Sequence, residues 1–237
     1  MELIKKDLDQ IIFRGKVETG IANSIRRYIN RIPTIAIDEI EISRNDSPLY
    51  DETIAHRMGL VPLSMEGVSE SKLPKIKLES KGEGSVYSGE IKGIKVIFDK
   101  IPLTTLGKDK ELIVEGTTNL GMGEEHSKYS PGILSYRNVS EITVSKKFAE
   151  KIKELCPKNE VKEKGNKVVI LDDKEKEILD FCEGVCNVEG EKAEVVFGED
   201  LILKLESFGQ LKNPEEVFKK STSELKKDLA SISKQLK

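Results

Sequence analysis

Three cysteines, Cys156, Cys182 and Cys186, are the first candidates for chemistry in this 237-residue chain. Cysteine thiolates are frequent ligands of zinc and of iron–sulfur clusters. The first residues, MELIKKDLDQ, contain no apolar signal core, so we expect the protein to stay in the cytoplasm. In that reducing compartment we expect the cysteines to be thiols or metal ligands rather than structural disulfides.

The residue types that most often catalyse reactions form no recognisable constellation. His56 and His126 lie in different sequence contexts, and neither has a serine or cysteine nucleophile motif beside it. The sequence contains no P-loop, no dinucleotide-binding fingerprint and no HExxH motif. Paired acids are ordinary in a chain with 42 acidic residues, and we interpret them as surface or turn residues: Asp38-Glu39, Asp51-Glu52 and Asp172-Asp173. We therefore predict no catalytic residues.

The overall charge and hydropathy exclude two classes of protein. The chain carries 39 basic and 42 acidic side chains, a net charge of -3. A protein whose main task is to grip nucleic acid needs a clear basic excess, which is lacking here. No stretch approaches 18 consecutive apolar residues, so we predict no membrane-spanning helix.

Arg26 and Arg27 lie on a predicted helix near the N-terminus. We expect Thr19 to cap this helix and Pro33 to end it, and its apolar stripe is Ile21, Ile25, Tyr28, Ile29 and Ile32. Adjacent arginines beside such a stripe can bind a partner's carboxylates or carbonyls, although a solvated pair is the alternative. Residues 2–17 before the helix predict a strand or a hairpin, and residues 35–42 after it predict a strand.

The middle of the chain divides into two regions. Residues 70–145 predict a small β-rich domain, because short strands alternate there with Gly and Pro: 76–78, 86–91, 94–98, 112–116 and 142–144. Residues 146–197 are rich in Lys and Glu and contain the cysteines, so we interpret them as a separate insert. Its predicted helices are 146–155 and 174–181, and its predicted strands are 168–171 and 193–197.

A long helix follows a predicted strand at 201–205. Asn213 can cap it, Pro214 fits its first position, and Glu216 occupies the place of a capping-box acid. A narrow apolar stripe with coiled-coil spacing follows: Phe218, Leu225, Leu229, Ile232 and Leu236. A rod of roughly 36 Å with so narrow a stripe favours a partner helix, and packing on its own domain is the alternative.

Four blocks of the sequence, in order along nearly the whole chain, resemble the alpha-like subunits of RNA polymerase. The first is Ala22-Asn23-Ser24-Ile25-Arg26-Arg27 followed by Ile32–Ile37, and the second is Asp51-Glu52 with Ala55–Leu63. The third runs from Ile101 to Gly121-Met122-Gly123 and Glu125–Pro131, and the fourth is Glu206–Gly209. The similarity is strongest to the archaeal D subunits and the third subunit of eukaryotic polymerase II, and more distant to bacterial alpha.

This resemblance implies an α+β fold and a non-catalytic assembly subunit of a nucleotidyltransferase complex. It implies a partner, the small alpha-like L subunit, and contacts with the two large subunits and the small N and P subunits. The implied domains are a dimerisation domain in two parts, 1–46 and 198–237, an inserted β-rich domain at 47–145, and a ferredoxin-like insert at 146–197. The predicted partner interface is Asn23, Arg26, Arg27, Phe218, Leu225, Leu229, Ile232 and Leu236.

Some archaeal D subunits carry a ferredoxin-like insert, and the sequence predicts that the iron–sulfur clusters of such an insert are lost here. A bacterial ferredoxin run is C-x2-C-x2-C-x3-C-P. We align the fourth cysteine of one such run with Cys156 and that of a second run with Cys186. Of the six earlier ligand positions, only Cys182 is a cysteine: Lys146, Ala149, Ile152, Lys176, Leu179 and Cys182. We therefore expect a ferredoxin-like fold without cofactor; a three-iron or zinc site on the three cysteines is the alternative.

Two other functions remain as hypotheses. A ferredoxin-type electron carrier or redox sensor would need the missing ligands. A free nucleic-acid-binding adaptor would need tight binding by the isolated chain at moderate salt, which the near-neutral charge balance does not predict.

Overall fold

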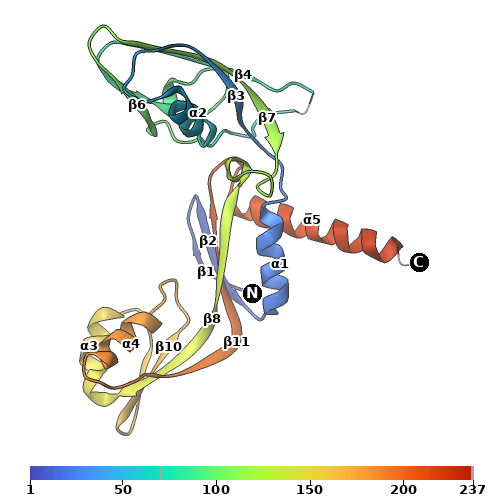
Figure 1. Ribbon diagram of the computed structural model, residues 1–237. Helices are drawn as coiled ribbons and strands as arrows, with labels where there is room; N and C mark the ends of the chain where they lie inside the picture. The colour runs from blue at the N-terminus through green and yellow to red at the C-terminus, as the bar shows by residue number, and fades with distance from the viewer. Residues whose placement is uncertain (70, 236–237) are drawn as a thin grey trace. The chain divides into compact units, whose positions relative to one another are not determined.

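The computed structural model describes residues 1–69 and 71–235, and it divides into two compact units (Figure 1). The first unit consists of Met1–Asn23 and Leu134–Leu205, and the second consists of Ser24–Ile133 and the chain from Glu206 onward. Each unit is therefore built from two separate stretches of sequence. The fold is α+β, with more strand than helix.

The first unit is built on a six-stranded sheet with the order β1-β2-β11-β8-β10-β9. The predicted N-terminal hairpin is confirmed, because β1 and β2 pair antiparallel with Glu2 opposite Arg14. The two strands predicted at 193–197 and 201–205 are one continuous strand, β11. The six strands are β1 (Glu2–Lys6), β2 (Gln10–Gly15), β8 (Gly132–Ser145), β9 (Val161–Lys164), β10 (Lys167–Asp172) and β11 (Glu194–Ser207).

Two short helices, α3 (Ala149–Leu155) and α4 (Leu179–Asn187), pack against β8 and β10 (Figure 1). A 3-10 turn at Lys146–Phe148 leads into α3. The helix predicted at 174–181 begins instead at Leu179, because the apolar periodicity starts only there. Ile178, Cys182, Val185 and Cys186 are buried at helical spacing, whereas residues 174–177 are exposed and charged.

The second unit contains a three-stranded antiparallel sheet with the order β3-β7-β4 and a separate two-stranded pair, β5 and β6. One face of this sheet, together with helix α2, encloses an aliphatic core that includes Ile35, Met58 and Leu112. Two 3-10 turns occur at Ser88–Glu90 and Ser127–Tyr129. The remaining elements are α2 (Asp51–Gly59), β3 (Thr34–Asn45), β4 (Lys75–Lys81), β5 (Gly84–Tyr87), β6 (Pro102–Leu106) and β7 (Glu111–Gly121).

The strand predicted at 94–98 is wrong. In this segment Val96 forms only an isolated bridge with Leu63, and the chain bonds to a loop rather than to a strand. The N–H of Ile97 donates to the carbonyl of Pro62. The segment is apolar because Val96 packs into the core. A residue can be buried in this way without belonging to a strand.

The two remaining helices are α1 (Thr19–Ile29) and α5 (Pro214–Gln235). The helix begins at Thr19, and the N–H groups of Ile21 and Ala22 donate to the carbonyl of Glu18, so Glu18 rather than the predicted Thr19 precedes the first helical residue. The predicted start of α5 is confirmed, because Asn213 Oδ1 accepts the N–H of Glu216 at 2.8 Å. Among the described residues, no helix is long and apolar enough to cross a membrane.

Candidate partner-binding surface

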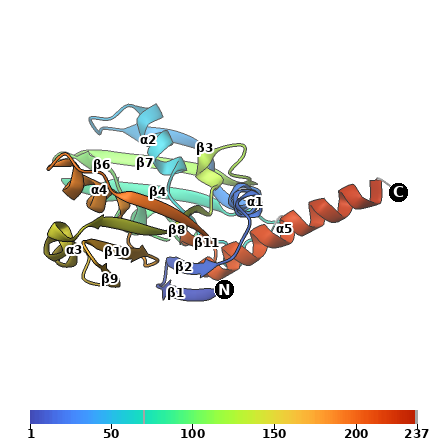
Figure 2. The ribbon, with the colours of Figure 1, turned by 90° about the horizontal axis from the view of Figure 1, so that it is seen from below.

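The apolar stripe of α5 changes from buried to exposed along the helix. Val217 is fully buried, and Phe218 and Leu225 are half-buried within the second unit. Leu229 is 58% exposed and Ile232 is 51% exposed, although both continue the same stripe. The second half of α5 therefore presents large aliphatic side chains to solvent. Figure 2 shows this half of the helix as the end of the ribbon that leads to the C-terminus. Leu236, the last member of the predicted stripe, lies outside the described residues.

A polar cluster fastens α5 to the end of α1. The Tyr28 hydroxyl donates to Asp228 Oδ2 at 2.8 Å, and Arg31 Nη1 reaches the same oxygen at 2.5 Å. Arg31 Nε also donates to Glu124 at 2.9 Å, and the guanidinium lies 4.8 Å from the centre of the Tyr28 ring. The hydrogen bond to Asp228 raises the pKa of Tyr28 above its ordinary value. These contacts fix the direction in which Leu229, the next residue of α5, points.

The basic residues of α1 lie on its outer side. Arg26 and Arg27 are exposed in the last turn, whereas Ile25 and Ile29 are buried on the opposite side. Asn23 is half-buried. The arrangement agrees with the predicted separation of the arginines from the apolar stripe.

Tyr28 and Asp228 were not among the predicted interface residues. Sequence patterns placed Tyr28 in the apolar stripe of α1, and they gave no reason to single out one acid of α5. The sequence did contain one indication of this contact, because Tyr28 is the only residue of that stripe whose side chain has a polar group that needs a hydrogen-bond partner. Its partner is 200 residues away in the sequence, so only the folded chain identifies it.

The two histidines of the chain, which the sequence left unconnected, line one cavity of about 230 Å³ in the second unit. His56 comes from α2, and His126 comes from the loop after β7. Asp38, from β3, also lines this cavity and pairs with Lys128 at 2.8 Å. That hydrogen bond lowers the pKa of Asp38. His126 Nδ1 accepts the N–H of Lys128 at 3.1 Å, which places the proton of a neutral ring on Nε2.

The three cysteines are buried in the core of the first unit. Cys182 and Cys186 lie on the inner side of α4, and Cys156 follows α3. Burial raises the pKa of all three thiols, and that of Cys182 rises to about 12. Within the described part of the chain, no group of three His, Cys, Asp or Glu side chains is placed to hold a metal ion.

Comparisons with known proteins agree with the four sequence blocks. The family model for the RNA polymerase Rpb3/RpoA insert domain matches residues 35–137. DNA-directed RNA polymerase subunit Rpo3 of Pyrococcus horikoshii is 33% identical over 187 residues, which are 72% of each chain. Rpo3 of Thermococcus kodakarensis is 34% identical over 71% of this chain and 72% of that protein. Rpo3 of Pyrobaculum arsenaticum is 30% identical over 91% of each chain. The chain therefore belongs to the Rpo3 family of DNA-directed RNA polymerase subunits, the alpha-like subunits called D in archaea.

Proposed function

We propose that this chain is a non-catalytic assembly subunit of DNA-dependent RNA polymerase that acts in the cytoplasm. The proposal rests on the exposed half of the α5 stripe, which consists of Leu229 and Ile232. Hydrogen bonds from Tyr28 and Arg31 to Asp228 hold this helix against the end of α1. Contiguous exposed aliphatic side chains on an otherwise polar helix are typical of a protein–protein interface. The relatives are named as polymerase subunits, which supplies the context for that interface.

The partner on this stripe is proposed to be the small alpha-like L subunit, which would add a helix of matching apolar spacing. Phe218 and Leu225 would form the inner end of the seam, and Leu229 and Ile232 the outer end. The resulting pair would be the platform for the two large subunits. Arg26, Arg27 and Asn23, on α1, are proposed to contact a large subunit rather than L. The N and P subunits are proposed as further neighbours.

Co-expression tests this proposal. The chain is produced with the L subunit of the same organism, and the mass of the purified complex is measured by multi-angle light scattering. We expect a one-to-one heterodimer that then binds the large subunits. Replacing Arg26 and Arg27 with Ala should weaken binding of a large subunit and leave the heterodimer intact, whereas Lys108→Ala with Lys110→Ala should change neither. A chain that binds no polymerase subunit would contradict the proposal.

The insert at 146–197, together with the parts of β8 and β11 that flank it in the first unit, is proposed to be a ferredoxin-like domain that has lost its clusters. Its elements follow the order β8-α3-β9-β10-α4-β11, which is the β-α-β-β-α-β order of a split βαβ unit. The cysteines do not fit a cluster, because burial stabilises their neutral thiols and apolar side chains surround them. Lys176 and Leu179, at two further ligand positions, offer no thiolate.

Iron analysis and visible absorption of the anaerobically purified protein test this part. We expect no iron above background and no sulfide-to-iron band. Stoichiometric iron with such a band would favour the electron carrier or redox sensor, a function that the names of the relatives do not support. Stoichiometric zinc would favour the regrouped site on the three cysteines.

A further inference from the structure

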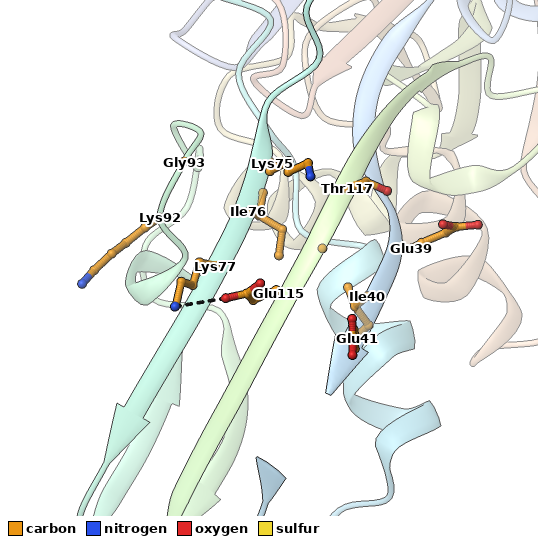
Figure 3. A pocket seen from close by; sticks show the side chains of 11 residues that line it. Glu39, Ile40, Glu41, Lys75, Ile76, Lys77, Lys92, Gly93, Glu115 and Thr117 are labelled. Carbon is orange, nitrogen blue, oxygen red and sulfur yellow. Dashed lines mark ion pairs between the residues drawn. The ribbon is translucent and has the colours of Figure 1, made fainter. Parts of the chain in front are cut away.

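The outer face of the β3-β7-β4 sheet carries a groove of about 580 Å³ (Figure 3). The register aligns its side chains in two cross-strand rows. In one row Glu39 of β3 and Lys75 of β4 both lie opposite Thr117 of the central strand β7. In the other, Glu41 and Lys77 lie opposite Glu115. These side chains are all exposed, so the groove is acidic along β3 and basic along β4.

The fold leaves the charges of this β3-β7-β4 groove largely uncompensated. Glu39 and Glu41 form no ion pair with any described residue. Lys75 and Lys92, which lies on the rim beside β4, also form no ion pair within the part of the chain that the structure describes, although the charge of Lys92 contributes to lowering the pKa of Glu79. Four unpaired charges therefore stand in two groups of opposite sign, with β7 between them.

One contact in the groove is unfavourable within the isolated chain. Glu41 and Glu115 are direct cross-strand neighbours, and like charges in that position destabilise a sheet. On the other side of β7, Lys77 partly neutralises the charge of Glu115, because its Nζ lies 3.0 Å from the carboxylate (Figure 3). No corresponding cation among the described residues reaches Glu41. A cationic group from outside, placed between β3 and β7, would remove this repulsion.

The basic rim of the groove is held in place by the backbone. Lys77 and Lys92 exchange two main-chain hydrogen bonds, at 3.0 Å and 2.8 Å, which attach the rim loop to β4. The next residue, Gly93, has a φ of +101°, and a Cβ there would lie 2.0 Å from the carbonyl oxygen of Lys75. The loop can approach β4 this closely only because Gly93 lacks a side chain. The loop that carries Lys92 is therefore attached to β4 by the fold of the chain itself.

We propose that the β3-β7-β4 groove binds a segment of another polymerase subunit whose charges have the opposite order. Its Arg or Lys side chains lie over Glu39 and Glu41, where a guanidinium can bind carboxylates bidentately. Its Asp or Glu side chains lie over Lys75 and Lys92. This complementarity fixes the orientation of the segment across the sheet, because the reverse orientation would place like charges together. The inference rests on the proposed function.

Reversal of charge in the groove tests the proposal within the assembled complex. Glu39→Lys with Glu41→Lys is compared with Glu83→Lys and Glu154→Lys, which make the same change in net charge at exposed positions elsewhere. Each chain is co-expressed with the other subunits, and the NaCl concentration that releases half of each subunit is measured. We expect the groove variant to release one subunit at roughly half the wild-type concentration, while the control variant matches the wild type. Circular dichroism and the melting temperature establish that both variants fold.

Two further measurements keep the outcomes distinct. The milder Glu39→Gln with Glu41→Gln should produce a smaller shift in the same direction, even if the lysine variant folds poorly. A photo-crosslinking residue at Thr117 should label one segment that carries both basic and acidic residues. Release of the subunits at the same NaCl concentration from groove and control variants, or a crosslink to an uncharged segment, would overturn the proposed role of the groove. Neither result would contradict the proposed function. A wild-type chain that joins no polymerase subunit would overturn the proposed function.

Discussion

Arg31 and Asp228 lie 2.5 Å apart, Nη1 to Oδ2, and join the end of α1 to the middle of α5. The Tyr28 hydroxyl shares the same carboxylate oxygen. Both ionic side chains are less than half exposed, so the pair excludes part of the surrounding water. Its role is geometric, because the last buried residues of α5 precede Asp228 and the exposed seam follows it. The orientation of the proposed interface depends on this junction.

Replacing Asp228 with Asn should move the titration of Tyr28 toward the ordinary tyrosine value. The carboxylate hydrogen bond is the largest cause of the raised pKa of Tyr28, and an amide holds the phenol proton less strongly. Absorbance at 295 nm during an alkaline titration follows the five tyrosines, and Tyr28→Phe identifies the contribution of Tyr28. Identical titration curves for the wild type and Asp228→Asn would show that the hydrogen bond does not form in solution.

Replacing Leu229 with Asp, or Ile232 with Asp, should weaken binding of the small partner by at least about 30-fold. That factor corresponds to about 2 kcal/mol, the lower bound for a residue central to an interface. Both side chains are more than half exposed in the free chain, so its own folding should be unaffected. Leu225→Asp with Leu229→Asp should abolish pairing.

The matched controls for this seam are Ser223→Asp and Ala230→Asp, which place the same charge on the opposite side of α5. Isothermal titration calorimetry or a co-expression pull-down provides the measurement. Unimpaired pairing of the seam variants, or equal impairment of the controls, would exclude the stripe as the interface.

Cys182 should resist modification in the native protein. With a pKa of about 12, the thiolate is about one part in 10,000 at pH 8, and the side chain is fully buried. Ellman's reagent should therefore react slowly with the folded chain and at once with three thiols in guanidinium chloride. Fast reaction of the native thiols would contradict the burial. Cys182→Ser should reduce the free energy of unfolding by about 1–3 kcal/mol, because its hydroxyl would lack a partner.

Replacing Arg137 with Met should destabilise the first unit by about 3–5 kcal/mol, because Asp172 would keep a buried, uncompensated charge. Arg137 Nη1 lies 2.9 Å from Asp172 Oδ2, and Asp172 is 1% exposed. Its other oxygen, Oδ1, has no hydrogen-bond partner among the described residues. Arg137→Met with Asp172→Leu should be less destabilising than Arg137→Met alone, as measured by urea denaturation.

The same pair predicts a dependence on pH. Burial raises the pKa of Asp172 in the folded chain, so its ionisation disfavours folding above that pKa and has no effect below the unfolded value of 3.8. Without Arg137 the folded pKa should rise further. The loss of stability in Arg137→Met should therefore be largest near neutral pH and shrink on acidification. A loss that is independent of pH would mean that packing, rather than charge, is responsible.

The sequence alone determined the elements whose signals are local. The N-terminal hairpin, α1, β3 and the start of α5 each follow from periodicity or from a capping residue such as Asn213 within a few positions. The four family blocks and the apolar stripe of α5 were equally visible. These features depend on residues that are close together in the sequence, so the amino-acid sequence is sufficient to identify them.

The tertiary structure decided what depends on residues distant in sequence. Helix α2 buries only Ile54 and Met58, too few to establish a helical period, and the segment at 94–98 takes its shape from the loop around Pro62. Three features arise because folding brings separate segments together. They are the contact between Tyr28 and Asp228, the cavity that His56 and His126 share, and the opposed charges of β3 and β4. Local pattern shows which side chains must be buried or exposed, and only the packed chain shows which of them meet.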